Sequence, residues 1–452
     1  MHAEILTIGD ELCRGEIIDT NSAYLAAQLW DLGVTTRWMT SCNDDEADLA
    51  AAVTQAVSRA DLVVCSGGLG PTEDDLTVDV VARLAGVEPV IDGPARARME
   101  AWFAGRVEVT PIQLRQVRVP SGARVHENPV GLAPCFEVTM AIPGGGKVPV
   151  ICLPGVPREL YAIFDRGLRA HLTKLRDARP EREAIARRIY RVFGRGESQI
   201  SQACRGLVDN VPKTSIHYQV KFPETLVKLV CRDRDQAVAD ARLAELDHEI
   251  RQRLAPQLYS TSESGGESES MIERVMRRLL AAKQTCATAE SCTGGMVGEM
   301  LTRMPGSSNA FLGGAITYTN DEKERQLGVR HETLVAHGAV SEETAREMSA
   351  GARERFGCDH AVAITGIAGP DGGSAEKPVG TVWISLASKD GRHVARKLLW
   401  PSTRDQVRLL SAWWALALID AAVTLPEDSE AERARAAWIF SDASSASMVR
   451  KR

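Results

Sequence analysis

The chain has 452 residues, of which 44% are apolar and 25% are charged, and its formal net charge is −6. These values are typical of a soluble globular protein and exclude a disordered or fibrous one, while the length favours two or three domains. The mild acidity argues against a dedicated nucleic-acid binder, which would usually carry a basic patch. We therefore expect a multidomain globular protein with no nucleic-acid partner.

The ten cysteines form no CxxC pair, and most lie within apolar runs such as LVVC and VPVICLPG. This usage is typical of small buried side chains in a reducing compartment, not of a disulfide framework or a zinc site. The N-terminus carries Glu4 where a signal peptide would be uncharged. The apolar stretch 409–419 is shorter than the roughly 20 residues that span a bilayer. The sequence therefore predicts a cytoplasmic protein with no membrane partner.

Residues 1–172 alternate short apolar runs with helical patterns. The runs AEILTIG, LVVCSGG and VPVICLPG each end in glycine, and YLAAQLWDLG and LTVDVVARLAG show helical periodicity. This repetition predicts an α/β domain with a largely parallel sheet, in which ligands bind at the carboxyl ends of the strands.

Residues 180–258 predict a small α+β module, with strands in IARRIYRVFG, SIHYQV and ETLVKLVCR and a long helix in DQAVADARLAELDHEIRQRL. The polar stretch TSESGGESES (261–270) is the best linker candidate. Residues 268–425 again alternate, with strands expected in QTCATAE, GGAITYT, HAVAITGI and TVWISLAS, and they predict a second α/β domain. The tail 426–452 is charged and then serine-rich, and we expect it to be disordered.

The stretch AESCTGG (289–295) places Ser291 beside Cys292 at a predicted strand-to-helix turn. The unpaired N–H groups of a helix N-terminus favour anions, so those near Gly294 and Gly295 could stabilise an oxyanion. A simpler interpretation is that the hydroxyl groups cap the helix. A serine nucleophile needs a base, and Lys323 in ITYTNDEKERQLG is a candidate, although spacing alone favours a solvated surface lysine. A cysteine at a helix N-terminus also remains a possible nucleophile.

Two features further along the chain point to a ligand. The strand and loop AITGIAGPDGG (363–373) has Thr365 at its turn, and its many glycines suggest close approach of the backbone to a ligand. Arg404 falls in the first turn of a predicted helix, where a cation opposes the helix dipole. An anionic ligand would explain this position, as would pairing with Asp405.

In the first segment, TIGDE (7–11) and CSGGLGPTEDD (65–75) place carboxylates and glycines at predicted strand ends. Glycine N–H groups can cradle phosphate and carboxylates can hold a divalent ion, which is what pyrophosphate chemistry requires. Acidic residues in the first turn of a helix are also routine caps, so the pattern is weak by itself. The candidate positions are Asp10, Glu11, Gly67, Gly68, Gly70, Thr72, Asp74 and Asp75.

The motifs of the third segment occur in the order of a known family. AESCTGG, ITYTN…K, ITGIAGPDGG, KPVGTVW and STRDQVR resemble the CinA C-terminal domain, the nicotinamide-nucleotide amidase family. IGDEL, DTNSAYLA, GGLGPTEDDLT, NPVGLAP and LPGVPREL resemble the MoCF-like CinA N-terminal domain, and the middle module resembles the connecting domain of full-length CinA proteins. One departure is NPVGLAPCF, where Cys135 stands at a position that is usually glycine in the family.

The resemblance implies that the C-terminal domain hydrolyses nicotinamide mononucleotide to nicotinic acid mononucleotide and ammonia without a cofactor. Ser291 would be the nucleophile, Lys323 its general base and Tyr318 a support for this pair, while Thr365 would bind the intermediate or the substrate. Arg404 would bind the phosphate, and Cys292 would be only a neighbour. The substrate-binding positions of this domain would be Gly294, Gly295, Asn320, Gly366, Gly369 and Arg404.

For the N-terminal domain the resemblance implies hydrolysis of ADP-ribose to AMP and ribose 5-phosphate with a divalent metal of the Co²⁺ or Mg²⁺ class. The glycine loop (Gly67, Gly68, Gly70 and Thr72) would bind substrate, and Asp10, Glu11, Asp74 and Asp75 would hold the metal. The resemblance also suggests a homodimer. In one alternative only the amidase is active and the N-terminal domain merely binds a nucleotide. In another the chain is a molybdopterin-binding or scaffold protein.

Overall fold

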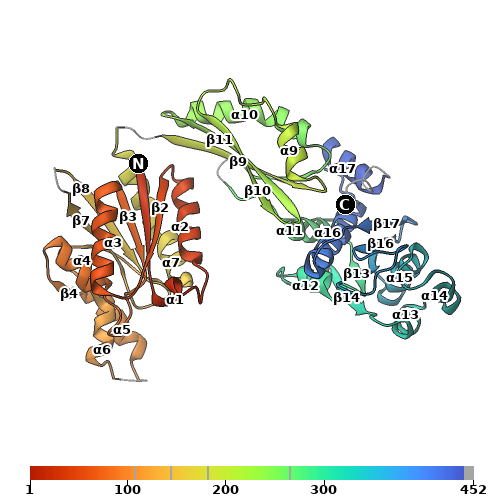
Figure 1. Ribbon diagram of the computed structural model, residues 1–452, viewed down its shortest axis with the longest axis horizontal. Coiled ribbons are helices and arrows are strands. Elements are labelled where there is room, and N and C mark those ends of the chain that lie inside the picture. Colours follow the sequence, from red (N-terminus) through yellow and green to blue (C-terminus); the bar gives the residue numbers. More distant parts are fainter. Residues whose placement is uncertain (106–107, 143–144, 181–182, 264–265, 442–452) are drawn as a thin grey trace. The chain divides into compact units, whose positions relative to one another are not determined.

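The computed structural model describes residues 1–441 except 106–107, 143–144, 181–182 and 264–265 (Figure 1). The chain divides into two compact units. The first comprises Met1–Ile185 and Arg232–Val238, and the second comprises Ala186–Cys231 and the chain from Ala239 onward. Within the described residues, no helix combines the length and the apolar character needed to cross a membrane.

The first unit is built on a six-stranded sheet with the order β2-β1-β3-β8-β7-β6. Neighbours among the first four strands pair in parallel, whereas β7 is antiparallel to both β8 and β6. A short connection joins β7 to β8, which permits a hairpin but not a crossover, so the sheet is mixed. The strands are β1 (His2–Ile8), β2 (Thr35–Cys42), β3 (Leu62–Ser66), β6 (Arg124–His126), β7 (Cys135–Ala141) and β8 (Lys147–Leu153).

Helices cover both faces of this sheet, so its central strands β1 and β3 are buried along nearly their whole length. On one face, α3 and α4 pack on Leu6, Val63 and Cys65; on the other, α2, α7 and α8 pack on Ile5 and Val64. A separate ribbon pairs β4 (Pro89–Ile91) with β5 (Arg118–Pro120). The helices are α1 (Asp10–Cys13), α2 (Thr20–Asp31), α3 (Glu46–Arg59), α4 (Thr77–Ala85), α5 (Gly93–Phe103), α6 (Pro111–Leu114), η1 (Arg115–Val117), α7 (Pro157–Ile163), η2 (Phe164–Leu168) and α8 (Arg169–Asp177).

The middle of the chain forms a four-stranded sheet with the order β10-β11-β9-β12 and two helices. The expected linker after it is partly built into this fold, because Ser262 donates its N–H to Ile189 and Ser268 accepts a hydrogen bond from Arg191. The elements are β9 (Ala184–Phe193), α9 (Glu197–Ala203), β10 (Thr214–Lys221), β11 (Glu224–Asp233), α10 (Gln236–Leu254) and β12 (Leu258–Thr261).

The rest of the second unit surrounds a five-stranded sheet with the order β14-β13-β15-β16-β17, of which the first three strands are parallel. Helices α11, α12, α16 and α17 contribute to the core on one face, and α15 packs on the other. The strands are β13 (Cys286–Glu290), β14 (Phe311–Ile316), β15 (His360–Gly366), β16 (Thr381–Ser388) and β17 (His393–Leu399). The helices are α11 (Met271–Ala282), α12 (Met296–Thr302), η3 (Ser307–Asn309), α13 (Asn320–Leu327), α14 (His331–His337), α15 (Glu342–Phe356), α16 (Arg404–Ala422) and α17 (Glu430–Phe440). The predicted α/β class, with a small α+β module in the middle, is confirmed.

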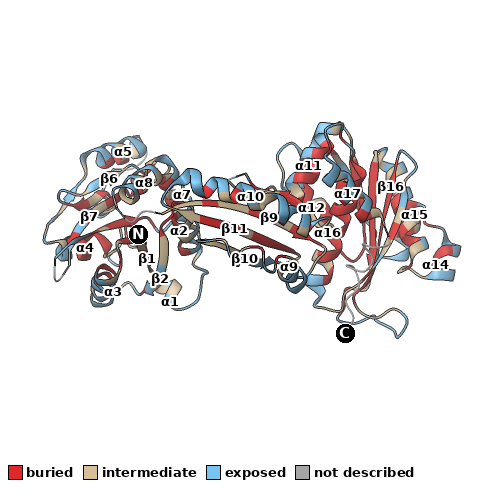
Figure 2. Ribbon diagram, turned by 90° about the horizontal axis from the view of Figure 1, so that it is seen from above, coloured by how far each residue is buried: buried red, intermediate tan, exposed pale blue. Residues whose placement is uncertain are grey.

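The expectation of disorder from residue 426 is wrong for residues 430–440, which form α17. Ser429 caps this helix, which packs on α16 (Figure 2). Its residues Trp438 and Ile439 are buried in the core to which α16 contributes. The ring of Trp438 lies 6.1 Å from that of Trp414. The charged composition of this segment did not indicate a helix, because the helix is stabilised by packing on an apolar surface that only the folded domain provides. Residues 442–452 of the predicted tail lie outside the described residues.

Cys135, which stands where the family resemblance would usually place glycine, requires no strained backbone. Cys135 begins β7, where it pairs with His126, and its side chain is fully buried. Among the described residues, only Lys213 and Lys283 combine a side chain with positive φ. Since the position is extended, it does not need glycine.

Candidate active site

Ser291 lies in the turn between β13 and α12, at the carboxyl end of the parallel part of its sheet. Its N–H donates to the carbonyl of Ile364 on the neighbouring strand β15, with 2.9 Å between nitrogen and oxygen. The side chain is 8% exposed. The fold therefore presents this hydroxyl at the sheet edge where ligands of α/β domains bind.

Lys323 is buried, not solvated as spacing alone would favour. It lies in the first turns of α13 and is 1% exposed. Its Nζ donates to Oγ of Ser291 at 3.1 Å and to the carbonyl of Thr317 at 2.8 Å. Burial lowers the pKa of Lys323 to about 8, since removal from water disfavours the charged amine. A deprotonated amine at this distance can take the serine proton.

Cys292 is the other nucleophile that the sequence leaves open. It is 6% exposed, and burial raises the pKa of its thiol to about 12. The thiolate is the reactive form of cysteine, so this side chain is protonated and weakly nucleophilic at neutral pH. Of the two neighbours, Ser291 therefore has both the base and the position to react.

The carboxylate of Glu290 occupies the N-terminus of α12. Its Oε2 accepts the N–H groups of Gly295 and Val297 at 3.0 and 3.2 Å, and its Oε1 accepts that of Gly298 at 3.0 Å. Glu290 is 1% exposed. A buried carboxylate with three N–H donors satisfies both the helix terminus and its own charge.

An oxyanion site near Gly294 and Gly295 stays a prediction, but the N–H groups of these two glycines already have acceptors. The N–H of Gly295 is bound to Glu290, and that of Gly294 donates to the carbonyl of Ser291 at 3.1 Å. The N–H groups of Cys292 and Thr293 donate to no carbonyl in the described part of the chain. These two groups, directly after Ser291, are the donors that remain for a developing negative charge.

Arg408, which the sequence analysis missed, holds this turn from α16. Its Nε donates to the carbonyl of Cys292 at 3.2 Å and its Nη2 to that of Thr293 at 2.9 Å. The donated hydrogen bonds fix the direction of the two peptide groups. No local pattern could identify Arg408, because the turn lies more than a hundred residues away in the chain.

Arg404 and Tyr318 meet near the Ser291–Lys323 pair. Arg404 donates from Nη2 to the Tyr318 hydroxyl at 3.1 Å and from Nη1 to the carbonyl of Gly369 at 2.8 Å. The carbonyl of Tyr318 lies 3.5 Å from Nζ of Lys323, so its backbone, not its phenol, contacts the pair. Tyr318 is 59% exposed. Arg404 is thus connected to the Ser291–Lys323 pair through Tyr318, whose side chain it binds and whose carbonyl lies near the amine.

The remaining predicted residues of this domain have local partners. Thr365 is 1% exposed and donates from Oγ1 to the carbonyl of Ala339 at 2.7 Å. At Gly366 a Cβ atom would lie 2.5 Å from the side chain of Val382, so close strand packing already accounts for this glycine. Asn320 is the exposed first residue of α13. Direct substrate contact by Thr365, Gly366 and Asn320 stays a prediction.

The first unit contains a pocket of about 590 Å³ at the carboxyl ends of β1, β3 and β8. The glycine loop after β3 forms one wall. Gly67 has φ of +114°, and a Cβ there would lie 2.2 Å from the carbonyl oxygen of Ile8, so only glycine fits. The other predicted residues that line the pocket are Gly68, Gly70, Thr72, Glu11, Asp74 and Asp75.

The four carboxylates predicted to hold a metal have different surroundings. Asp75 accepts the N–H groups of Gly70 and Thr72 at 2.7 and 2.8 Å, so it shapes the glycine loop. Asp10 pairs with Arg14 and is not among the lining residues. Glu11 and Asp74 line the pocket.

Asp44, which sequence reasoning missed, also lines this pocket. Burial, with a smaller contribution from nearby carboxylates, raises the pKa of Asp44 although the N–H of Asp10 opposes this. A pocket rich in carboxylate oxygens is the donor chemistry that Mg²⁺ and similar hard divalent ions prefer. Glu11, Asp44 and Asp74 line the pocket and could each offer an oxygen to such an ion. Their oxygens do not form a group of three within 4.8 Å of one another, so substrate phosphate or water would have to complete the coordination.

Three family models match consecutive parts of the chain. Residues 4–174 match "Probable molybdopterin binding domain", residues 187–260 "Damage-inducible protein CinA KH domain" and residues 268–423 "CinA C-terminal domain". A Symbiobacterium thermophilum protein described as competence-damage inducible is 42% identical over 429 residues, which cover 93% of this chain and 98% of that relative. A CinA-like protein of Myxococcus xanthus is 38% identical over 420 residues, with coverage of 93% and 97%. The chain belongs to the CinA family.

Solved structures similar to this CinA protein cover one part of it. The competence/damage inducible protein CihA from Agrobacterium tumefaciens is 43% identical over 32% of this chain and 92% of its own, with a TM-score of 0.32. A CinA protein from Thermoplasma acidophilum is 36% identical over 37% of this chain and 96% of its own, with a TM-score of 0.34.

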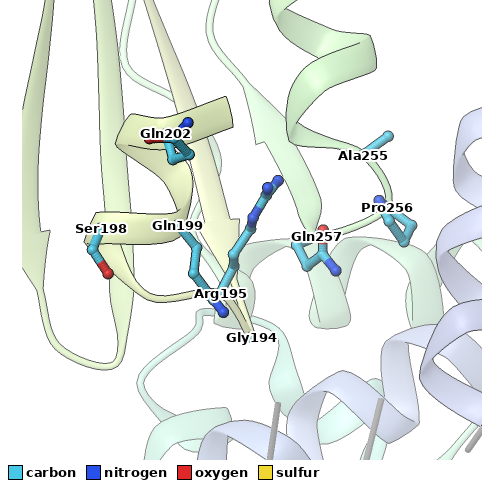
Figure 3. Close-up of a pocket in the computed structure, with 8 residues that line it drawn as sticks. All are labelled: Gly194, Arg195, Ser198, Gln199, Gln202, Ala255, Pro256 and Gln257. Carbon is cyan, nitrogen blue, oxygen red and sulfur yellow. The ribbon is translucent and has the colours of Figure 1, made fainter. Parts of the chain in front are cut away.

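Another hollow of this CinA protein, of about 600 Å³, lies in the middle module beside α9 and the segment before β12 (Figure 3). The guanidinium of Arg195 donates to the carbonyl of Arg253 at 2.9 Å, so it has a structural partner. None of the lining side chains is a carboxylate, imidazole or thiol, so the hollow offers no acid–base pair. The lining residues are Gly194, Arg195, Ser198, Gln199, Gln202, Ala255, Pro256 and Gln257.

Proposed function

We propose that this protein is a pyridine-nucleotide hydrolase whose C-terminal domain converts nicotinamide mononucleotide to nicotinic acid mononucleotide and ammonia. The observation that carries the proposal is the buried amine of Lys323, 3.1 Å from the hydroxyl of Ser291. The likeness of its motifs to the nicotinamide-nucleotide amidases supports the choice of substrate. An amine with a lowered pKa is suited to remove a serine proton near neutral pH.

In this reaction the hydroxyl oxygen of Ser291 attacks the carboxamide carbon while neutral Lys323 accepts the hydroxyl proton. The N–H groups of Cys292 and Thr293 stabilise the negative charge that develops on the carboxamide oxygen. When the carbon–nitrogen bond breaks, Lys323 returns the proton to the leaving ammonia. Water, deprotonated by the same amine, then hydrolyses the ester to release the carboxylic acid and restore Ser291.

Arg404 supplies recognition of the nucleotide in this proposal. Arg404 is exposed, and its guanidinium is hydrogen-bonded to Tyr318 and Gly369. A phosphate is a strong acceptor for a guanidinium, because both groups are charged and their geometries match. Binding the phosphate at Arg404 would orient the pyridine ring so that its carboxamide faces Ser291.

Ammonia release from nicotinamide mononucleotide tests the proposal in wild type, Ser291→Ala and Cys292→Ala. We expect Ser291→Ala to lose activity by about 1,000-fold or more, as is usual for a catalytic nucleophile. Cys292→Ala should retain activity, because only its backbone N–H takes part. Activity that survives in Ser291→Ala but not in Cys292→Ala would refute the mechanism. A wild type that releases no ammonia would refute the amidase itself.

A second activity, hydrolysis of ADP-ribose to AMP and ribose 5-phosphate, is proposed for the pocket of the first unit. The glycine loop and the carboxylates of Glu11, Asp44 and Asp74 support it. A divalent ion bound there would offset the charge of the pyrophosphate. AMP release from ADP-ribose with added Mg²⁺ or Co²⁺ is the test. Nucleotide or pterin binding without AMP release would instead favour a binding module.

A further inference from the structure

Three metal-ligating side chains lie together in the first unit, outside the glycine-loop pocket. His126 ends β6, Glu137 lies in β7 and His171 lies in α8. One ligand atom from each lies within 4.8 Å of the others. No other such group of three is found in the described part of the chain. None of the three residues lines the pocket at the strand ends.

The fold explains why residues from three elements meet here. In the antiparallel pair of β6 and β7, His126 lies opposite Cys135, and Glu137 is two residues further along β7. Because side chains alternate along a strand, these three share one face of the sheet. Helix α8 packs on that face, where its Leu172 shares a core with Cys135 and Ile151. His171, one residue before Leu172, thereby reaches the antiparallel pair of β6 and β7 at the edge of the sheet.

The hydrogen bonding of the cluster is incomplete. Nε2 of His171 lies 2.5 Å from Oε2 of Glu137, and the rings of His126 and His171 have centroids 5.2 Å apart. Nε2 of His126, however, is buried and has no hydrogen-bond partner among the residues that the structure describes. A buried nitrogen without a partner costs about 1–3 kcal/mol, and coordination to a cation would remove that cost.

The side chains of His171 and Glu137 are 12% and 11% exposed, so solvent reaches the edge of the cluster. Water can therefore complete the coordination of an ion held by three protein ligands.

We propose that His126, Glu137 and His171 bind one divalent transition-metal ion of the class that prefers imidazole, with Zn²⁺ as the representative. Two imidazole nitrogens and one carboxylate oxygen are a common ligand set for Zn²⁺ and for other first-row ions. This set differs from the carboxylate oxygens of the glycine-loop pocket, which suit harder ions. Because the ion would join strands β6 and β7 to helix α8, its binding would stabilise the folded first unit.

Zn²⁺ titration of the full-length, chelator-treated chain in competition with a chromogenic chelator tests this site. We expect one tight Zn²⁺ per wild-type chain and a rise in the melting temperature on binding. His126→Ala and His171→Ala should each weaken binding by about 100-fold or more, exceeding the usual effect of losing an outer partner of a ligand. His248→Ala removes an exposed histidine of the middle module and should bind like wild type.

Glu137→Gln separates metal binding from folding. Its amide can keep a hydrogen bond to His171 but is a poor ligand, so the metal-free melting temperature should hold while Zn²⁺ affinity falls. Co²⁺ gives a second readout, because the wild type should show visible absorption that Glu137→Gln and the histidine variants lose. A wild type that binds no Zn²⁺ would overturn the proposal. Binding that is undiminished in Glu137→Gln and in the His126→Ala, His171→Ala double variant would also overturn it.

Discussion

Lys323 places its amino group 3.1 Å from the hydroxyl of Ser291 although 32 positions separate the two residues. The other acceptors of this amine are the carbonyls of Thr317 and Tyr318. No carboxylate pairs with Lys323 among the described residues. A buried amine with neutral acceptors loses the proton more readily than one in water or in an ion pair. The fold thus prepares a base for the serine.

The rate of ammonia release should rise with pH and level off above about 8, the pKa to which burial lowers Lys323. Only the neutral amine accepts a proton, and at pH 7 about a tenth of the chains carry it. Measurement of kcat/KM between about pH 6 and pH 10 checks this. Lys323→Met should be inactive throughout. A rate that is flat or falls across this range would rule out Lys323 as the base.

Glu290→Gln should destabilise the second unit by about 2 kcal/mol, because an amide group would face N–H donors that now bind a carboxylate. Ammonia release should also fall, since the turn that carries Ser291 loosens. Chemical denaturation measures the loss of unfolding free energy. The matched control is Glu299→Gln on the same helix, whose exposed pair with Arg303 should contribute about 0.5 kcal/mol or less. Equal losses in both variants would contradict this account of Glu290.

Arg404→Met should raise KM for nicotinamide mononucleotide by about 10- to 100-fold and leave kcat nearly unchanged, since a hydrogen bond to a charged group contributes about 1.5–3 kcal/mol. Steady-state kinetics with nicotinamide riboside provide the control. This substrate has no phosphate, so the variant and the wild type should process it alike. An equal loss on both substrates would show that Arg404 serves the site in another way.

Asp74→Asn and Asp75→Asn should act differently. Asp74 lines the pocket and makes no hydrogen bond to the described residues, so its variant should lose metal-dependent AMP release at an unchanged melting temperature. Asp75 holds Gly70 and Thr72, so its variant should lose about 1–3 kcal/mol of stability. AMP assays and thermal melts distinguish the two. A melting temperature lowered equally by both changes would contradict these roles.

Local patterns predicted much of the fold because they arise from local physics. The strands predicted from AEILTIG, LVVCSGG and VPVICLPG are confirmed as β1, β3 and β8. The strand predicted from QTCATAE is confirmed as β13, which ends just before Ser291. Alternation and periodicity reflect which side chains a strand or helix must bury. The mixed direction of both sheets was not evident, because pairing direction depends on connections and on neighbours distant in sequence.

The candidate site shows the same limit. Spacing alone favoured a solvated Lys323, and the glycines after Ser291 suggested free N–H donors. In the structure the lysine is buried, and the carboxylate of Glu290 accepts the N–H groups at the start of α12. The signal for Glu290 was present in AESCTGG, since a carboxylate just before a helix often binds its first N–H groups. No feature of the sequence near Arg408 indicated its role, because it reaches the turn after Ser291 only when α16 packs beside that turn.

By itself the sequence determined the family, the α/β class and the turns at which chemistry could occur, because motif order and apolar periodicity are properties of the chain. The tertiary structure decided which groups are buried and which meet. It lowered the pKa of Lys323 to about 8, kept Cys292 protonated, ordered α17 and gathered His126 with His171. Those outcomes depend on burial and on contacts between residues distant in sequence, and folding alone creates both.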